Sequence, residues 1–255
     1  MSRFFTGPEN IGQKTIIIDD RDDLHHMIKV LRLKEGDEVD VSDTVEWEYH
    51  AKIVSLDKDE AQLEILDKQA FGAEPDVEVT LFQGIPKSGK METIIQKCVE
   101  LGVHDIVPVF MDRTVVVDRG NFGKKIERWN KVSAEAVKQC KRGIIPEVLD
   151  AVKMEDVYDA FADYDLVLFP YENEKGKTIK EALLTSTNPM YEEITGNKLE
   201  RIAIIIGPEG GFSDEEAEEI VAAGGESVSL GKTILRTETA GMAALAMVMY
   251  ELEIE

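Results

Sequence analysis

The chain has 255 residues, of which 43% are hydrophobic and 31% charged, a composition typical of one large soluble domain or two modest ones. Its formal net charge of −22 argues, taken alone, against a polyanionic partner. The two cysteines exclude a disulfide framework and a four-thiolate zinc site, and no apolar run reaches the roughly 18 residues of a membrane span. We therefore expect a cytoplasmic protein with reduced thiols.

The negative charge is unevenly distributed along the chain. Residues 81–150 hold 12 basic and 9 acidic side chains, whereas residues 151–255 hold 8 and 22. A nucleic-acid surface should therefore draw on residues 81–150, together with a few N-terminal cations.

Residues 1–70 are predicted to form a small β-barrel. Its expected strands are short runs rich in β-branched residues or alternating in polarity, at 15–18, 38–41, 49–54 and 61–66. A stretch with glycine and proline follows at 67–76, and it predicts a linker to a second domain.

Residues 75–255 are predicted to form an α/β domain. Nearly continuous apolar strands are expected at 77–82, 106–110, 166–169 and 202–206. Helical patterns lie between them, which indicates a buried, mainly parallel sheet with helices on both faces. Cys98 and Cys140 fall on the apolar faces of two such helices, so a packing role is favoured for both thiols.

The segment 84–90 matches the pattern G-x-x-x-x-G-K between a strand and a helix, where a phosphate-binding loop would lie. Met91 replaces the Ser or Thr hydroxyl that would bind Mg²⁺. A basic loop whose Lys87 and Lys90 touch an RNA phosphate is therefore favoured over nucleotide hydrolysis, which stays as a lesser alternative.

A second motif, Gly-Pro-Glu-Gly-Gly-Phe-Ser at 207–213, follows the most hydrophobic strand. Ser213 and Glu216 form the pattern of a capping box, so a helix should start there. Three glycines in five positions allow the main chain to approach a ligand closely. Open α/β sheets bind ligands at the carboxyl ends of their strands, and the motif therefore predicts a ligand-binding loop.

A third motif occupies 230–240 and leads into a helix rich in alanine and methionine. Thr237 or Thr239 can cap that helix, but capping does not explain Arg236 at the point where the chain leaves the sheet. Two glycine-bearing loops at consecutive strand ends, one with an arginine, are more specific together than either is alone.

These two loops closely resemble those of the RsmE-type 16S rRNA (uracil-N3) methyltransferases of the SPOUT superfamily. Further matches to that family are spread along the chain, at Arg3-Phe4-Phe5, His25-His26, 30–32, 36–37, 97–103 and 135–142 with Pro146. The resemblance implies an α/β fold in which a SPOUT trefoil-knot methyltransferase domain, residues 75–255, is preceded by a PUA-like RNA-binding β-barrel, residues 1–70. It also implies a homodimer that holds S-adenosylmethionine (SAM) in the knot.

By this resemblance, three loops form the cofactor pocket. The residues expected to contact SAM are Leu168, Phe169, Tyr171, Ile206, Gly207, Glu209, Gly210, Leu230, Gly231, Ile234, Leu235 and Thr239. Thr233 stands where relatives usually carry a second arginine. Adjacent histidines at 25 and 26 do not have the spacing of metal ligands, and no metal site is expected.

The resemblance also implies the reaction, methylation of N3 of a specific uridine in 16S rRNA of the small ribosomal subunit. Uracil N3 carries a proton that must leave, so a nearby cation should stabilise the charge that develops on the uracil oxygens. We hypothesise that Arg236 is this catalytic group, and Glu209 is a weaker candidate for a base. Contacts with RNA are expected from Arg3, Arg32, Lys87, Lys90, Arg113 and Arg142.

Two alternative functions remain open besides methylation of N3 of a uridine in 16S rRNA. One is a SPOUT methyltransferase acting at another rRNA or tRNA position. The other is a non-catalytic RNA-binding factor in ribosome assembly that retains the fold; the two glycine loops and Arg236 argue against this second alternative.

Overall fold

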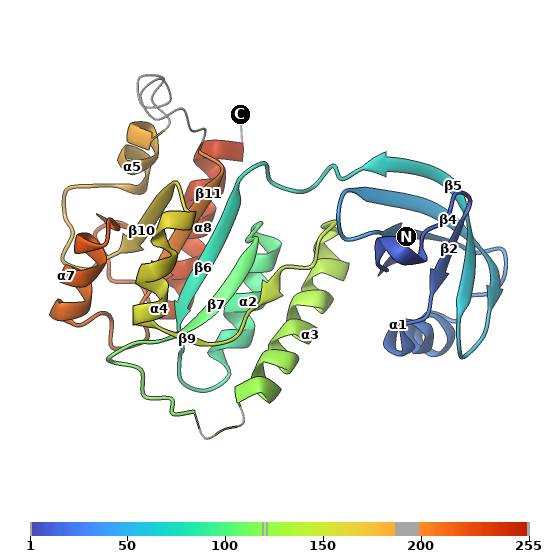
Figure 1. The fold of residues 1–255 in the computed structure, drawn as a ribbon, viewed down its shortest axis with the longest axis horizontal. Coiled ribbons are helices and arrows are strands. Elements are labelled where there is room, and N and C mark those ends of the chain that lie inside the picture. The colour runs from blue at the N-terminus through green and yellow to red at the C-terminus, as the bar shows by residue number, and fades with distance from the viewer. Residues whose placement is uncertain (1, 119, 121, 187–198, 254–255) are drawn as a thin grey trace. The chain divides into compact units, whose positions relative to one another are not determined.

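The computed structural model describes residues 2–118, 120, 122–186 and 199–253 (Figure 1). The chain divides into two compact units. Unit 1 comprises Met1–Glu74 with Val137–Ile145, and unit 2 comprises Pro75–Ala136 with Pro146–Glu255. The short second segment of unit 1 lies outside the range 1–70 expected for the barrel.

Unit 1 is built on a five-stranded sheet in the order β1-β3-β4-β5-β2. Its elements are β1 (Arg3–Phe5), η1 (Pro8–Asn10), β2 (Thr15–Ile18), α1 (Arg21–His25), η2 (His26–Leu31), β3 (Glu38–Ser42), β4 (Trp47–Leu56) and β5 (Ala61–Ala70). The predicted strands are thus confirmed. Alternation places Ile16 and Ile18 in the core while Ile17 stays exposed. The prediction of a linker from residue 67 is wrong for its first residues, because β5 continues to Ala70 and pairs there with Trp47.

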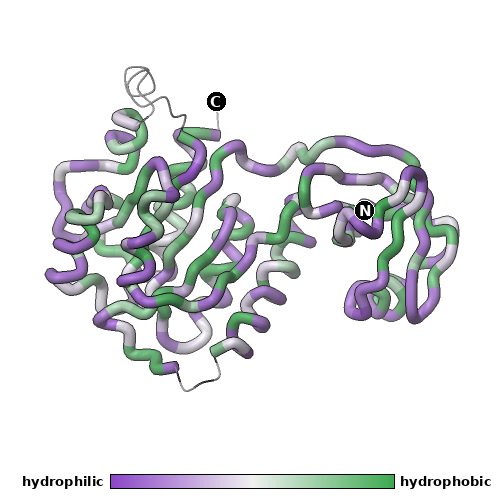
Figure 2. Tube along the Cα trace, in the orientation of Figure 1, coloured by the Kyte–Doolittle hydropathy of each residue, from purple (hydrophilic) through white to green (hydrophobic). Residues whose placement is uncertain are grey.

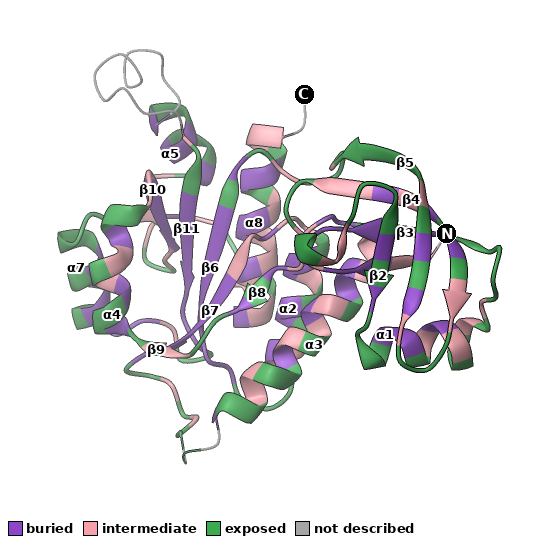
Figure 3. Cartoon of the chain, turned by 45° about the vertical axis from the view of Figure 1, so that its right-hand side comes forward, coloured by how far each residue is buried: buried purple, intermediate pink, exposed green. Residues whose placement is uncertain are grey.

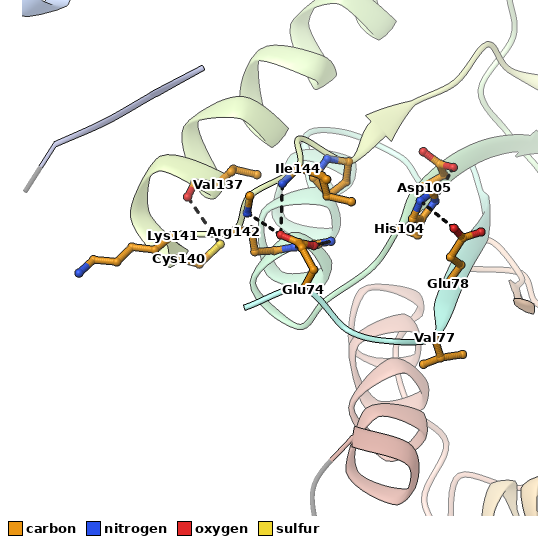
Figure 4. A network of polar contacts seen from close by, with 12 residues as sticks. Glu74, Val77, Glu78, His104, Asp105, Val137, Cys140, Lys141, Arg142 and Ile144 are labelled. Atoms are coloured by element: carbon orange, nitrogen blue, oxygen red, sulfur yellow. Dashed lines mark hydrogen bonds and ion pairs between the residues drawn. The ribbon is translucent and has the colours of Figure 1, made fainter. Parts of the chain in front are cut away.

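The carboxylate of Glu74, whose side chain is 15% exposed, ties the segment 137–145 into unit 1 (Figure 4). Glu74 accepts hydrogen bonds from Arg142, 3.1 Å from Nε and 2.8 Å from Nη2 to its Oε2. Its other oxygen accepts the backbone N–H groups of Gly143 at 2.5 Å and Ile144 at 3.2 Å. The ring of Phe71 lies so close to Gly143 that a Cβ there would meet it at 2.5 Å. A glycine and an ion pair therefore fix this segment.

Arg142 is consequently misplaced among the predicted RNA contacts. Only 4% of the residue is exposed, and its guanidinium faces Glu74. Sequence reasoning favoured an RNA contact because Arg142 lies in residues 81–150, the net-positive section of the chain. Here the buried position is stabilised because the charge is paired and hydrogen-bonded.

Unit 2 is built on a parallel sheet in the order β12-β10-β11-β6-β7-β8, with β9 also pairing β7. Its strands are β6 (Glu78–Gly84), β7 (Asp105–Phe110), β8 (Glu147–Val148), β9 (Val152–Lys153), β10 (Leu166–Pro170), β11 (Arg201–Ile206) and β12 (Glu226–Val228). Its helices are α2 (Lys90–Glu100), α3 (Phe122–Cys140), α4 (Met154–Asp159), η3 (Ala160–Asp163), α5 (Ile179–Ser186), α7 (Asp214–Ala222) and α8 (Thr237–Glu253). The end of α3, from Val137 on, is counted with unit 1. The four strands predicted for this region are confirmed.

The central strands are apolar because helices cover both of their faces (Figures 2 and 3). On one face, Leu81 of β6 approaches the position of Gly241 in α8. On the other, the next residue, Phe82, joins a core with Val157 of α4 and Ile220 of α7. Successive side chains of a strand point to opposite faces, so one apolar strand supplies two cores.

The two cysteines differ in burial. Cys98 is completely buried, which raises the pKa of its thiol to about 12 and confirms its packing role. Cys140 is half-buried, and its Sγ donates to the Val137 carbonyl at 3.8 Å. Among the described residues, no helix has the length and apolarity to cross a membrane.

Replacing Arg142 by methionine should destabilise unit 1 by about 3–5 kcal/mol, because the Glu74 carboxylate would remain mostly buried without its cation. Hydrogen exchange of the β4 and β5 amides measures the loss in this unit specifically. The exposed neighbour Lys141 provides the control, since Lys141→Met removes the same charge without unpairing a buried group. Equal loss of protection in the two variants would contradict the structural role of the ion pair.

Candidate functional site

A cavity of about 470 Å³ lies at the carboxyl edge of the unit 2 sheet. Its walls come from the segments that follow three strands: 170–174 after β10, 206–212 after β11 and 229–237 after β12. In open parallel sheets this edge is the usual place for a ligand, and pockets for small molecules measure about 300–1,000 Å³. Both the location and the size therefore suit a small ligand.

The wall after β11 is held rigidly at both ends. A Cβ on Gly207 would meet the backbone of Gly211 at 3.1 Å, and Gly211 adopts a φ of 69°. The predicted capping box is confirmed: Ser213 Oγ accepts from the Glu216 N–H at 3.0 Å, and a Glu216 oxygen accepts from the Ser213 N–H at 3.0 Å. The glycines turn the chain sharply, and the box starts α7 directly behind the turn.

The wall after β12 bends at Gly231, whose φ of 121° is a conformation that favours glycine. The Ser229 N–H donates to the Lys177 carbonyl at 2.7 Å, which fixes the start of this wall against the segment after β10. Further along, Ile234 is 79% exposed although it lines the cavity. An apolar side chain at the mouth of a cavity offers a surface for a flat ring.

The wall after β10 is shaped by Glu174. Its carboxylate accepts the backbone N–H of Gly176 at 2.7 Å and of Lys177 at 3.1 Å, and the hydroxyl of Ser227 at 2.7 Å. These hydrogen bonds, first of all the one from Gly176, lower the pKa of Glu174 to about 2. The carboxylate is therefore ionised at neutral pH and closes the turn that carries Glu172 into the cavity wall.

A buried chain of hydrogen bonds joins the walls to the start of α8. Gln83 Nε2 donates to Thr237 Oγ1 at 2.9 Å, and the Thr237 hydroxyl donates to the Gly207 carbonyl at 2.7 Å. Thr237, expected as a helix cap, instead connects β6, the loop after β11 and α8. This connection sets the position of Arg236, the residue directly before α8.

Arg236 lies in the cavity wall with an exposed side chain. Within the described parts of the chain, its guanidinium makes no hydrogen bond or ion pair. It therefore presents a positive charge to whatever enters the cavity. Across the wall, Glu209 accepts from the Lys87 N–H at 3.1 Å and lies 3.1 Å from Lys90 Nζ. Burial raises the pKa of Glu209, but the hydrogen bonds outweigh it and leave that pKa below its usual value.

The structure brings most of the predicted cofactor contacts to the cavity. Those that line it are Tyr171, Ile206, Gly207, Glu209, Leu230, Gly231, Ile234 and Leu235. Leu168 and Phe169 are instead completely buried in the sheet, because the chain reaches the edge only after β10 ends. Gly210 and Thr239 also lie outside the lining.

Several lining residues were not named as cofactor contacts, although Pro208, Gly211, Lys232 and Thr233 lie in the two glycine loops expected to form the pocket. They are Lys90, Pro170, Glu172, Glu174, Pro208, Gly211, Phe212, Ser229, Lys232, Thr233, Thr237 and Ala240. The lining residues at 170–174 could have been predicted by counting onward from the end of the strand predicted at 166–169. The motif at 84–90 marked Lys90 only as a phosphate contact, and nothing local in the sequence indicated that it reaches this cavity from α2.

The remaining predicted RNA contacts fall into two groups. Arg32, Lys87 and Arg113 are exposed, and Arg113 donates to the Gly210 carbonyl at 2.8 Å beside the cavity. Arg3 pairs with Glu48 and donates to the carbonyls of Lys141 and Arg142, so its guanidinium is used inside unit 1. Lys90 is held by Glu209 and Glu238. No cluster of three or more possible metal ligands occurs in the described part of the chain.

Comparison with known proteins identifies the family. A model of the RNA methyltransferase domain matches residues 73–249, and a model of the RNA methyltransferase PUA domain matches residues 18–66. The ribosomal RNA small subunit methyltransferase E of Bacillus subtilis is 31% identical over 236 residues, which cover 91% of this chain and 89% of that protein.

Two solved structures are similar over nearly the whole chain. One is a ribosomal RNA small subunit methyltransferase E from Neisseria gonorrhoeae bound to S-adenosyl methionine, with a TM-score of 0.81, 30% identity and coverage of 99% of this chain and 98% of that chain. The other, from Legionella pneumophila, is in complex with the bound cofactor SAM, with a TM-score of 0.82, 29% identity and coverage of 98% and 97%.

The fold and the cavity thus define an RNA methyltransferase of the SPOUT class, whose α/β trefoil-knot domain is preceded by a PUA-like barrel. The fold class implied by the resemblance is confirmed. With these matches, the chain belongs to the ribosomal RNA small subunit methyltransferase E family.

Replacing Thr237 by valine should lower the free energy of unfolding by about 1–3 kcal/mol, because the Gly207 carbonyl and the Gln83 amide would lose a buried partner. Urea denaturation measures the change. Thr239→Val is the matched control, since this neighbouring threonine is exposed and its loss should change stability by less than about 0.5 kcal/mol. A Thr237 variant as stable as the control would mean that the buried chain of hydrogen bonds does not hold α8.

Proposed function

We propose that this protein is a SAM-dependent methyltransferase that methylates N3 of a uridine in 16S rRNA of the small ribosomal subunit. One observation carries the proposal: a glycine-walled cavity at the carboxyl edge of a parallel sheet has in its wall Arg236, whose guanidinium makes no hydrogen bond or ion pair with the described residues. Because the substrate is ribosomal RNA, we place the reaction in the cytoplasm.

The residues of the cavity fit SAM. Leu230, Ile234 and Leu235 provide apolar surface for an adenine ring. The carboxylates of Glu172 and Glu174 give the wall after β10 a negative charge, which suits the ammonium and sulfonium cations of the cofactor. The positive φ at Gly211 and Gly231 turns the main chain tightly around the space.

SAM supplies an activated methyl group, so the protein mainly aligns the two reactants. Uracil N3 must also lose its proton, and the resulting negative charge spreads to the flanking oxygens. We assign the stabilisation of that charge to Arg236, whose guanidinium is exposed to the cavity and makes no internal pair among the described residues. Glu209 is less suited to be a base, because its carboxylate already accepts from the Lys87 N–H and forms an ion pair with Lys90.

N3 lies on the pairing edge of uracil, so the target nucleotide must be unpaired or flipped out of its stack. Lys87 and Arg113 are exposed on loops that touch the wall after β11, Lys87 through its backbone N–H and Arg113 through its guanidinium. We propose that both contact phosphates beside the target nucleotide. Arg32, exposed on unit 1, is proposed as a further contact with the RNA.

We also propose that the protein acts as a homodimer. Leu184 of α5 and Met247 and Tyr250 of α8 are exposed large apolar side chains on two helices that pack together. We propose these exposed apolar side chains as part of a protein interface. A second copy of the chain is the partner that the family resemblance implies.

Arg236→Ala should lower the rate of methyl transfer by about 10²–10³-fold, the loss typical when one donor to a developing oxyanion is removed. The Kd for SAM should stay unchanged. Calorimetry measures the Kd, and single-turnover methylation of unmodified small subunits measures the rate, with mass spectrometry of the nucleosides locating the methyl group. Arg236→Lys keeps the charge and should retain more activity. Wild-type turnover in Arg236→Ala would remove this residue from the chemistry.

Removing Lys87 or Arg113 should reduce the salt dependence of RNA binding. If each contacts one phosphate, its replacement by alanine lowers the slope of log affinity against log salt by about 0.7–0.9. Binding of 16S rRNA at several salt concentrations measures the slopes. Lys180→Ala removes an exposed cation that pairs with Glu251, and serves as the control. Slopes identical to the control would exclude phosphate contacts at 87 and 113.

A further inference from the structure

The G-x-x-x-x-G-K loop at 84–90 binds an anion that belongs to the chain itself. The Lys87 N–H lies 3.1 and 3.2 Å from the two carboxylate oxygens of Glu209, and Lys90 Nζ lies 3.1 Å from one of them. A backbone amide and a lysine are the groups with which such a loop would hold a phosphate. Here Glu209 takes that position, which gives the loop a role other than nucleotide binding.

Lys90 binds a second carboxylate as well. Its Nζ lies 3.1 Å from Glu238 Oε2, the same distance as from Glu209 Oε1. The three side chains are about one third exposed or less. The pKa of Lys90 is raised by its two carboxylate neighbours, first Glu209 and then Glu238, so the ammonium stays charged at neutral pH. One cation therefore connects the first residue of α2, the loop after β11 and the first turn of α8.

The two carboxylates belong to functional segments. Glu209 lies in the cavity wall after β11, and Glu238 stands two residues after Arg236. Without a cation between them, they would repel each other, because both approach the same point. They would also add negative charge beside the Arg236 guanidinium, at a site that must admit an anionic RNA.

We propose that Lys90 is a positioning residue for methyl transfer. By binding Glu209 and Glu238 it holds the cavity wall after β11 and the Arg236 segment together, and it offsets one of their two negative charges at the cavity. The proposal rests on the proposed function for the identity of the ligand. The hydrogen-bonded path from Gln83 through Thr237 to Gly207 joins the same segments inside the protein. Nearer the surface, the ion pairs of Lys90 join the same segments.

The first experiment compares Lys90→Met with Lys97→Met in the protein without cofactor. Lys97 also lies in α2, but it pairs with Glu100. Hydrogen exchange of 207–211 and of the first turn of α8 should accelerate in Lys90→Met and stay at the wild-type rate in Lys97→Met. Unchanged exchange in Lys90→Met would overturn the proposal, whether or not the protein binds SAM.

The second experiment measures the Kd for SAM by calorimetry. Lys90→Met should bind SAM about tenfold more weakly, the size of effect typical of coupled neighbouring charges. Lys90→Arg should restore binding, and adding Glu238→Gln to Lys90→Met should recover part of it by removing one of the opposed charges. A Lys90→Met protein with wild-type affinity, or a double variant no better than Lys90→Met, would overturn the charge argument.

The two experiments separate this proposal from the proposed function. A wild-type protein that does not bind SAM, combined with faster exchange in Lys90→Met, would reject SAM as the ligand and keep the positioning role. A wild-type protein that binds SAM, combined with unchanged exchange and affinity in Lys90→Met, would keep the function and reject the role of Lys90.

Discussion

Parallel pairing of four strands is the constraint on which the site depends. β11 pairs with β6 on one side and β10 on the other, and β10 pairs with β12, all in parallel. Their hydrogen-bond ladders fix the register residue by residue, so the carboxyl ends of strands far apart in the sequence meet at one edge. Each loop leaves the sheet beside its neighbours, and the buried Thr237 hydroxyl then ties the loop after β12 to the loop after β11. The cavity is a consequence of this alignment, and the glycines adapt the loops to it.

Many acidic side chains act as internal hydrogen-bond acceptors, which explains why the net charge of −22 is a poor guide to the partner. Asp43 accepts the backbone N–H groups of three residues, at 45, 46 and 47, and thereby closes a hairpin that has no glycine. Burial raises the pKa of Asp43, but these hydrogen bonds outweigh it and lower that pKa overall. Glu74, Glu174 and Glu209 organise turns in the same way. These carboxylates interact with backbone amides or paired cations inside the protein, whereas the side chains of Lys87 and Arg113 remain exposed at the surface.

Local sequence patterns were sufficient to predict the longer strands, the two glycine loops and the edge of the sheet where they meet, but not the short strands β1, β8 and β9. Each of these features follows from residues that are close in the sequence, as in the run of isoleucines of β11 or the capping box at Ser213. The errors concern side chains whose surroundings come from elsewhere. Phe169 was expected in the pocket but packs in the core, because the sheet extends past it. Arg142 was expected at the surface but is buried against Glu74, 68 positions earlier in the chain.

The loop at 84–90 shows why such errors cannot be removed by closer attention to the motif. A loop that binds a phosphate and a loop that binds a carboxylate need the same groups, a backbone amide and a lysine, because both hold an anion. The choice between them depends on whether the fold brings a carboxylate to that point. Here Glu209 arrives from 122 positions away in the sequence, delivered by the pairing of β11 with β6. The motif identifies an anion-binding loop, and only the tertiary structure identifies the anion. Because Glu209 belongs to the cavity wall after β11, its ion pair with Lys90 connects the start of α2 to the candidate site.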